Sequence, residues 1–333
     1  MAGGQERILR RRIKSVQSTK KITRAMELIA ATRVVQAQER TRKARPYAEQ
    51  ITNVILDLAG AGASTNHPLL AEREAGGKAA FVVVTSDRGL AGAYNSAVIR
   101  AAEREIQAAR TEGLDYSLFV VGKKALTYFR FRGYKIDHVF LGKTDRPSYE
   151  DAREIGQAVG AAFEAGELAR VDLVYTRFLS AGSQKVVVRR FLPLEIDDGD
   201  PEGDNLRADF EFEPSPDGIL DVLVPRYVEA RLYAALLDAS ASEHASRQRA
   251  MKAATDNAEE LIISLARAMN RARQDAITTE IMEIVSGAEA LSQSGAGEDD
   301  LLPDHVLGQH LFPTHLSDHE HLPRPHHAAP APS

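Results

Sequence analysis

The sequence predicts an α/β protein in which one long helix from each end of the chain forms a long antiparallel coiled coil, with a small Rossmann-like α/β domain inserted between them. Three observations predict this fold. From Ile219 to Leu291 there is no glycine before Gly287 and a single proline, Pro225. A helix rises about 1.5 Å per residue, so one of this length must pack on a second helix and on a partner. A similar glycine-poor stretch opens the chain, and short apolar runs alternate with amphipathic runs over 78–193.

Residues 1–60 are predicted to form the first coiled-coil helix. Apolar residues recur there every three or four positions, which lays one face along the helix: Leu9, Ile13, Val16, Thr19, Ile22, Met26 and Ile29. We expect Pro46 to kink or restart the helix, because its ring clashes with the preceding turn. The apolar face continues from Ile51 to Leu58, and the Gly-Ala run at 60–64 ends it.

The inserted domain, residues 78–193, is predicted to have the element order βαβαβαββ. The run AAFVVVT (79–85) is continuously apolar, as expected of a strand buried on both faces. The last two strands flank Ala181-Gly182-Ser183 and predict a hairpin. The expected strands are 79–85, 116–122, 135–141, 171–180 and 184–193, and the expected helices are 96–110, 123–132 and 148–167.

The second coiled-coil helix is predicted over 218–291, after an acidic loop or foot at 194–217. Its apolar residues are spaced by three and four, an average near 3.5 that favours a left-handed coiled coil. They are Val228, Leu232, Leu236 and Ala239, then Leu261, Leu265, Met269, Ala272 and Ala276, then Ile277, Ile281, Ile284, Ala288 and Leu291. The small and polar stretch 239–258 is expected to keep the helix pair thin, like a shaft in a sleeve. Residues 292–333 are expected to form a disordered tail rich in His and Pro.

Composition excludes several classes of function. The chain has no cysteine, so it has no disulfide or thiolate metal site. We expect no signal peptide and no membrane-spanning segment, because no apolar run approaches the required length. The pI near 6.1 argues against a general nucleic-acid binder. Charge is uneven: residues 1–45 carry 13 Lys/Arg against 3 Asp/Glu, net +10, and residues 195–221 carry 11 Asp/Glu against one Arg, net −10.

No sequence motif predicts a catalytic, cofactor or metal site. The phosphate-loop pattern is absent, which argues against ATP hydrolysis by this chain alone. GLAGAYN (89–95) lacks the spacing of a dinucleotide fingerprint and favours a tight strand-to-helix turn. Asp87 and Arg88 lie at the carboxyl end of the first strand, where open α/β sheets often bind ligands, but no partner residues accompany them. The seven His of the tail could bind a metal only fortuitously.

Five segments carry a resemblance to a known family: KKITRAMELIAATR (20–33), TSDRGLAGAYN (85–95), FEPSPDGILDVLVPRYVEARLY (212–233), MKAATDNAEELI (251–262) and ARQDAITTEIMEIVSGAEAL (272–291). In these segments, and in order from about residue 3 to 291, the sequence resembles the γ subunit, or central stalk, of the rotary proton-translocating ATP synthase. Two features depart from the family. The 42 residues after Leu291 are additional, and the plastid-type cysteine pair is absent.

The resemblance implies a non-catalytic rotor shaft. The coiled coil would turn inside the hexamer of α and β subunits, and the α/β domain and foot would sit on the c ring beside the ε subunit. Rotation of the c ring, driven by protons, would then drive the β subunits through their conformational cycle and support ATP synthesis. The resemblance implies no cofactor, no nucleic-acid partner, and contact with the membrane only through the c ring. It also implies a peripheral position on the cytoplasmic face of a bacterial cell membrane.

The resemblance also implies particular contacts. Met26, with Arg24 and Arg33 nearby, would approach an acidic β-subunit loop. Arg273 and Gln274 would bind a β-subunit loop, for which the planar fork of arginine is suited. Two further contacts are expected: an apolar collar around the helix end and the c ring at the foot. The residues assigned to them are Ile277, Ile281 and Ile284 for the collar and Glu213 for the c ring.

Two other functions stay open at this point. One is an enzyme that uses the α/β domain as a nucleotide site. The other is a coiled-coil adaptor that binds an acidic partner or nucleic acid through residues 1–45. Its α/β domain could bind a nucleotide or not. The first requires a phosphate-binding glycine pattern and a convergent polar cluster. The second leaves the nearly uncharged strip at 239–258 unexplained.

Overall fold

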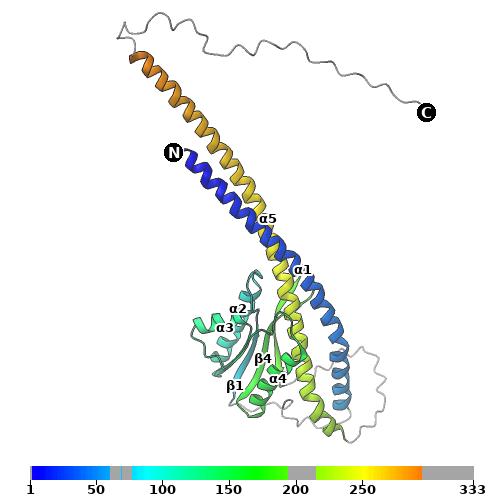
Figure 1. Ribbon diagram of the computed structural model, residues 1–333. Helices are drawn as coiled ribbons and strands as arrows, with labels where there is room; N and C mark the ends of the chain where they lie inside the picture. The colour runs from blue at the N-terminus through cyan, green and yellow to red at the C-terminus, as the bar shows by residue number, and fades with distance from the viewer. Residues whose placement is uncertain (1, 61–68, 70–76, 194–214, 295–333) are drawn as a thin grey trace, which may run out of the picture. The chain divides into compact units, whose positions relative to one another are not determined.

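The computed structural model describes residues 2–60, 69, 77–193 and 215–294 (Figure 1). It divides into two compact units, residues 7–269 and a second unit that includes residues 270–294, and each is described by itself. The elements are α1 (Ala2–Gly60), β1 (Lys78–Val84), α2 (Tyr94–Thr111), β2 (Tyr116–Val121), α3 (Lys123–Phe131), β3 (His138–Phe140), α4 (Tyr149–Glu164), β4 (Leu168–Phe178), β5 (Gln184–Leu192) and α5 (Pro216–Ser294).

The sheet confirms the predicted order βαβαβαββ. Its strands lie in the order β3-β2-β1-β4-β5. The pairs β1–β2, β1–β4 and β2–β3 are parallel, and β4–β5 is the antiparallel hairpin that the sequence predicts. The predicted third strand, 135–141, is too long: only His138–Phe140 pairs with β2, at the edge of the sheet.

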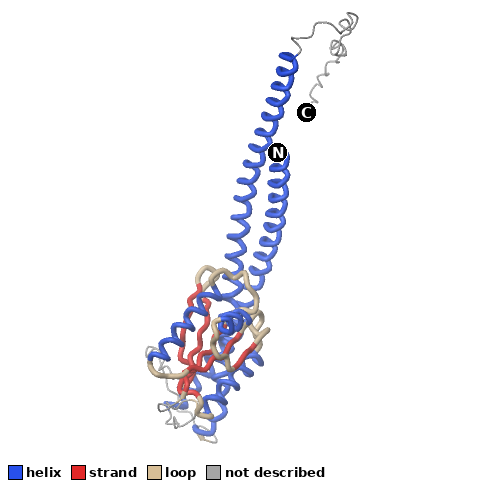
Figure 2. Tube along the Cα trace, turned by 90° about the vertical axis from the view of Figure 1, so that its left-hand side faces the viewer, coloured by secondary structure: helices blue, strands red, loops and turns tan. Residues whose placement is uncertain are grey.

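Both faces of the sheet are covered by helices (Figure 2). Alternate residues of β1 contribute to two separate cores, as the period of a strand requires. Phe81 and Val83 pack with α2 and α3, whereas Val82 and Val84 pack with α4, the end of α1 and the first part of α5. The prediction that β1 is buried on both faces is therefore confirmed.

Within residues 7–269, α1 and α5 lie side by side and antiparallel (Figures 1 and 2). The Thr23 and Thr255 hydroxyls are hydrogen-bonded at 2.8 Å, and Lys20 Nζ lies 3.1 Å from Glu259 Oε2. The seam steps by three and four, which is the spacing of a left-handed coiled coil. Its least exposed positions are 9, 13, 16, 20, 23, 27, 30, 34 and 37 on α1, and 251, 255, 258, 262, 265 and 269 on α5.

The predicted apolar stripe of α1 is correct only as far as Val16. Beyond it the seam runs through Lys20, Thr23 and Glu27, whereas Ile22 and Ile29 are 61% and 60% exposed. On α5, Leu261 is also exposed and Ile262 takes the seam position. The prediction failed because it assumed that apolar residues mark the contact between helices. Here small, polar and apolar side chains share the contact, and large apolar side chains such as Ile22 and Ile29 face outward as well.

Pro46 does not restart α1, which is one helix from Ala2 to Gly60. A proline within a helix deprives the carbonyl four residues earlier of its donor. That residue is Arg42, which is exposed, so water can hydrate its carbonyl. Of the two expected outcomes, the restart was therefore wrong, and a kink at Pro46 stays a prediction.

Residues 239–245, the first part of the small-residue stretch of α5, have a different role from the predicted one. Residues 239–245 are all buried, on every side of the helix. Tyr94 donates a hydrogen bond to the carbonyl of Ala239, and Ser242 donates one to the carbonyl of Thr176, each at 3.1 Å. Small side chains are needed here because the chain's own α/β domain packs closely around the helix. The interpretation of this part as a thin shaft for a sleeve was wrong.

The acidic segment 194–214 lies outside the described residues. So do residues 295–333, which make up most of the predicted tail. Helix α5 runs to Ser294, so it includes the first residues assigned to that tail. No helix among the described residues is both long and apolar enough to cross a membrane.

Candidate functional site

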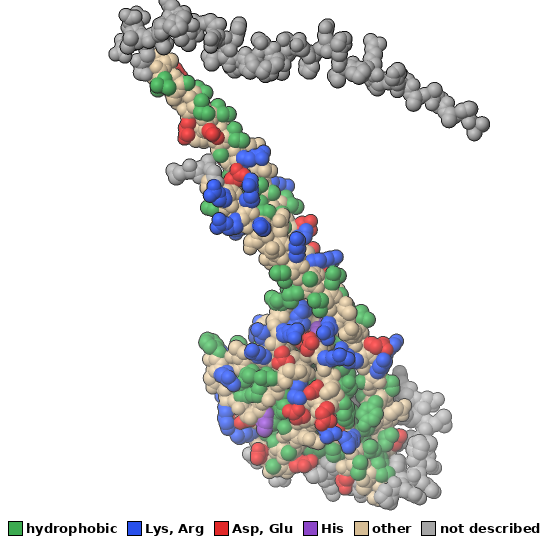
Figure 3. Space-filling view, viewed as in Figure 1, with side chains coloured by type: hydrophobic (Ala, Val, Ile, Leu, Met, Phe, Trp, Pro, Cys, Tyr) green, Lys and Arg blue, Asp and Glu red, His purple; other side chains and the backbone are tan. Residues whose placement is uncertain are grey.

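The paired helices present an outward surface that is both apolar and basic. On α1, Ile22, Leu28, Ile29 and Val35 are each more than half exposed. Figure 3 shows apolar and basic side chains together on the visible face of the helix pair. Apolar side chains that the chain leaves exposed in this number mark an interaction surface.

The predicted residues of α1 have partly internal contacts. Arg24 is largely exposed, and its Nη1 donates to both carboxylate oxygens of Glu27, each at 2.9 Å. Met26 is half-buried. Arg33 lies 3.9 Å from the carboxylate of Asp145, which belongs to the loop between β3 and α4. Arg24 and Met26 thus lie next to the outward surface, and Arg33 also holds α1 to the α/β domain.

The predicted residues near the end of α5 are all exposed. Arg273 and Gln274 carry no interaction with another described residue, and every residue of α5 from Ile277 to Ser292 is exposed. Among these, Ile277, Ile281 and Ile284 are 48%, 54% and 66% exposed. This segment is helical and offers both polar and apolar groups for contact. Glu213, the remaining predicted site residue, lies outside the described residues.

The carboxyl edge of the sheet, where a nucleotide would be expected, is filled by the chain itself. The Asp87 carboxylate accepts hydrogen bonds from the backbone N–H of Lys123, at the start of α3, and from the backbone N–H of Gly142, each at 3.0 Å. The Thr144 hydroxyl donates to it at the same distance. A helix N-terminus attracts phosphate because its N–H groups are unpaired. Here a carboxylate already occupies the N-terminus of α3.

Helix α5 crosses the same edge. The Ser240 hydroxyl donates to the carbonyl of Asp145 at 3.1 Å, and His244 Nε2 lies 3.1 Å from the same carbonyl. Arg247 donates from Nε and Nη2 to the carbonyl of Gly89, each at 3.3 Å. Helix α5 therefore occupies the crevice in which open α/β sheets bind ligands. We call the residues Glu243, His244 and Arg247 with their partners Gly89 and Asp145 the polar junction.

Sequence reasoning missed the polar junction. The signal was present: Glu243 and Arg247 are four residues apart on a predicted helix, inside a stretch of small residues. Charged residues within a stretch of small residues indicate that the stretch is buried against polar groups. On the exposed surface of a coiled coil, charged residues would not be confined to such a stretch.

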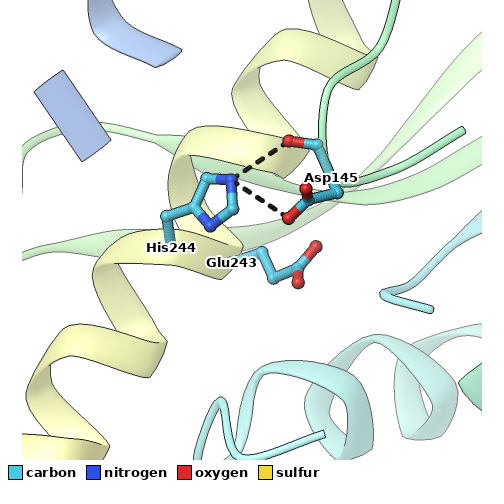
Figure 4. Close-up of side chains that lie close together, drawn as sticks. All are labelled: Asp145, Glu243 and His244. Atoms are coloured by element: carbon cyan, nitrogen blue, oxygen red, sulfur yellow. Dashed lines mark hydrogen bonds and ion pairs between the residues drawn. The ribbon is translucent and has the colours of Figure 1, made fainter. Parts of the chain in front are cut away.

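Asp145, Glu243 and His244 bring one potential metal-ligand atom each to within 4.8 Å of the others (Figure 4). Their hydrogen bonds argue against a metal. Arg247 Nη1 lies 3.4 Å from His244 Nδ1, and a guanidinium can only donate. Nδ1 must then hold the lone pair, and Nε2–H donates to Asp145. A metal would require the lone pair on Nε2, so these residues do not fit a metal centre.

Burial sets the ionisation of the polar junction. It raises the pKa of Glu243 to about 7, although the guanidinium of Arg247 acts in the opposite direction. Burial also lowers the pKa of His244, partly offset by its contacts with Asp145. His244 is therefore neutral at neutral pH, in agreement with the tautomer inferred from its hydrogen bonds.

A cavity of about 990 Å³ lies between α1, the first part of α5 and the β4–β5 hairpin. Its walls are largely apolar but include several arginines and tyrosines, which would suit an anion. Most of its arginines, however, have partners within the chain: Arg190 donates to Asp172 at 2.8 Å and Arg226 to Glu229 at 3.2 Å. Three further wall residues also have partners in the chain, namely Arg45, Arg189 and Arg231. The cavity gives no specific reason to expect a ligand.

Comparison with known proteins agrees with this geometry. The family model described as ATP synthase matches residues 5–291. The ATP synthase gamma chain of Frankia casuarinae is 52% identical over 295 residues, covering 87% of this chain and 98% of that protein. The gamma chain of Mycolicibacterium smegmatis is 48% identical over 302 residues, covering 86% of this chain and 98% of that protein.

Solved structures show the same fold. A chain of the Euglena gracilis mitochondrial ATP synthase (OSCP/F1/c-ring) matches with a TM-score of 0.63 and 19% identity, covering 91% of this chain and 99% of that chain. A chain of the Tetrahymena thermophila mitochondrial ATP synthase, from its central stalk and c-ring, matches with a TM-score of 0.53 and 23% identity. That match covers 70% of this chain and 99% of the other.

Proposed function

The chain belongs to the ATP synthase gamma-chain family, and we propose that it is the rotor shaft that couples rotation of the c ring to the catalytic β subunits. As a gamma chain it is a non-catalytic subunit of the complex. The observation that carries the proposal is the outward surface of the α1–α5 pair. Its seam is closed by other residues of the two helices, while Ile22, Leu28, Ile29 and Val35 remain exposed for a surrounding partner.

The shaft acts through differential contact. A rotating element can change the state of a neighbour only if its contacts differ between the states of that neighbour. The two units present different groups: basic residues along α1 in residues 7–269, and exposed isoleucines in α5 from Ile277 onward in the other unit. Each angular position would therefore present a different surface to each β subunit. Proton-driven rotation would then release ATP from each β subunit in turn.

Particular residues are proposed for these contacts. Arg24 and Met26 face an acidic β-subunit loop, and Arg33 lies near the same loop. Arg273 and Gln274 bind a second β-subunit loop, and Ile277, Ile281 and Ile284 rest in an apolar collar of the hexamer. Glu213 belongs to the foot on the c ring, beside the ε subunit. Support for the α5 contacts comes from the exposure of all five side chains.

We further propose a peripheral position on the cytoplasmic face of the bacterial cell membrane, reached through the c ring. The bacterial origin of the similar gamma chains supports this position. Affinity purification of the tagged chain from membranes tests assembly: the α and β subunits should co-purify in fixed proportion, together with the c ring. Recovery of the folded chain without α and β subunits would contradict the proposed function.

The alternative, a coiled-coil adaptor with a nucleotide-binding α/β domain, is not favoured. Asp87 occupies the N-terminus of α3, and α5 occupies the crevice at the carboxyl edge of the sheet. A nucleotide could enter only if the helix that forms half of the coiled coil were displaced.

A further inference from the structure

Arg247 uses its whole guanidinium to join two parts of the molecule. It is 8% exposed. Nε and Nη2 both donate to the carbonyl of Gly89, in the loop after β1. Nη2 also donates to the Glu243 carboxylate, and Nη1 donates to His244. One side chain thus ties two positions on α5 to the α/β domain.

Stability alone does not account for this pair. A buried ion pair often contributes nothing beyond what apolar side chains of similar volume would provide. The second carboxylate oxygen of Glu243, Oε2, is buried and has no hydrogen-bond partner among the described residues. An unsatisfied buried oxygen costs free energy. The arrangement carries this cost, and buried polar groups can specify a unique geometry.

The contacts around α5 oppose its rotation about its own axis. Successive helical residues are about 100° apart, so positions 240, 244 and 247 share one face and position 242 lies on the opposite one. The shared face is bonded to Asp145 and Gly89, and Ser242 is bonded to Thr176 of β4. A rotation in either sense would break directional hydrogen bonds on both faces.

We propose that Glu243 and Arg247 are positioning residues that form a torsional clamp, which fixes the rotation of α5 relative to the α/β domain. This role rests on the proposed function, in which torque must pass between the coiled coil and that domain. The planar fork of arginine suits the role, because it sets the direction of its bonds as well as their number. Lysine at the same position would keep the charge and lose the fork.

The clamp can be tested in the assembled α/β hexamer immobilised on a surface. The chain has no natural cysteine, so Thr111→Cys, at the exposed end of α2, attaches an optical probe to the α/β domain at one site. With ATP withheld, the spread of the probe angle reports torsional stiffness. We expect the variance of this angle to rise about twofold in Arg247→Ala, because two directional bonds to Gly89 are lost. Arg247→Lys should lie between that variant and the unchanged chain.

Two further variants make the outcome decisive. Lys252→Ala, an exposed cation on the same helix, should leave the variance unchanged. Glu243→Gln with Arg247→Met removes the fork and keeps a side chain of similar length at 247, so we expect it to assemble even if Arg247→Ala does not fold, and its variance should rise. An unchanged variance in this double variant would overturn the clamp. Failure of the unsubstituted chain to enter the hexamer would instead overturn the proposed function.

Discussion

At the scale of single residues, Glu243 is a carboxyl group whose ionisation opposes folding. Burial raises its pKa from 4.5 to about 7. The folded chain therefore binds more protons than the unfolded chain between these values, and this contribution to stability is present below pH 4.5 and lost as the pH rises through 7. The contribution amounts to roughly 3 kcal/mol. Glu243→Gln should remove it, so the fall in unfolding free energy from pH 5 to pH 8 should become smaller.

Urea unfolding of the purified chain, followed by circular dichroism at both pH values, measures this difference. Glu260→Gln is the matched control, because Glu260 is an exposed carboxyl on the same helix. The account of Glu243 is wrong if both variants keep the full pH dependence.

Asp87 provides a second prediction at this scale. Its carboxylate accepts three hydrogen bonds, from Lys123, Gly142 and Thr144. In Asp87→Asn the amide group can accept through only one atom, so a backbone N–H loses its partner. We expect a loss of about 1–3 kcal/mol in unfolding free energy, measured by urea unfolding. ATP binding by the unsubstituted chain that disappears in Asp87→Asn would show instead that this edge is a nucleotide site.

Single-residue roles were the hardest to predict from the sequence. Asp87 was recognised as lying at the carboxyl edge of the sheet, but its hydrogen bonds come from the start of α3 and from the loop after β3, both distant in the sequence. The spacing of Glu243 and Arg247 was a signal, but the partner of Arg247 outside the helix, the carbonyl of Gly89, is a backbone group that no residue pattern identifies. Such contacts depend on how loops meet, which local sequence does not specify.

At the scale of elements, the seam between α1 and α5 depends on small side chains. Ala37 is fully buried, and protein interiors are close-packed, so a longer side chain there must displace its neighbours. Ala37→Leu should therefore lower the unfolding free energy by about 1–3 kcal/mol through overpacking. Ala25→Leu is the matched control, since Ala25 is exposed on the same helix, and thermal unfolding of the purified chains compares the two. Equal stability of both variants would contradict the assigned seam.

The strands were easier to predict than the seam for a physical reason. AAFVVVT is buried on both faces, so its hydrophobicity alone identifies a central parallel strand. The coiled coil has two apolar surfaces to satisfy, one toward its partner helix and one outward. Ile22 and Ile29 belong to the outward surface. A single sequence does not show whether an apolar residue contacts the partner helix or faces outward. The predicted stripe therefore crossed from one surface to the other after Val16.

At the scale of the whole molecule, Arg273 and Gln274 test contact with the hexamer. Both are exposed, so Ala at both positions should leave the helix intact, because alanine is the best helix former. A charge-assisted hydrogen bond is worth about 1.5–3 kcal/mol. If the contact forms in only some rotary positions, ATP hydrolysis should slow by about tenfold, while the yield of complex stays normal. Unchanged rates at normal yield would show that these residues are solvated surface.

The central claim is that this chain turns as a shaft within a ring of catalytic subunits. The most direct test is to follow a probe on Thr111→Cys in single complexes held to a surface through the α/β hexamer, with ATP supplied. The account predicts that the probe rotates in one direction, in steps, for as long as ATP is hydrolysed. Sustained ATP hydrolysis by complexes that contain the chain and whose probe stays at one angle would contradict it.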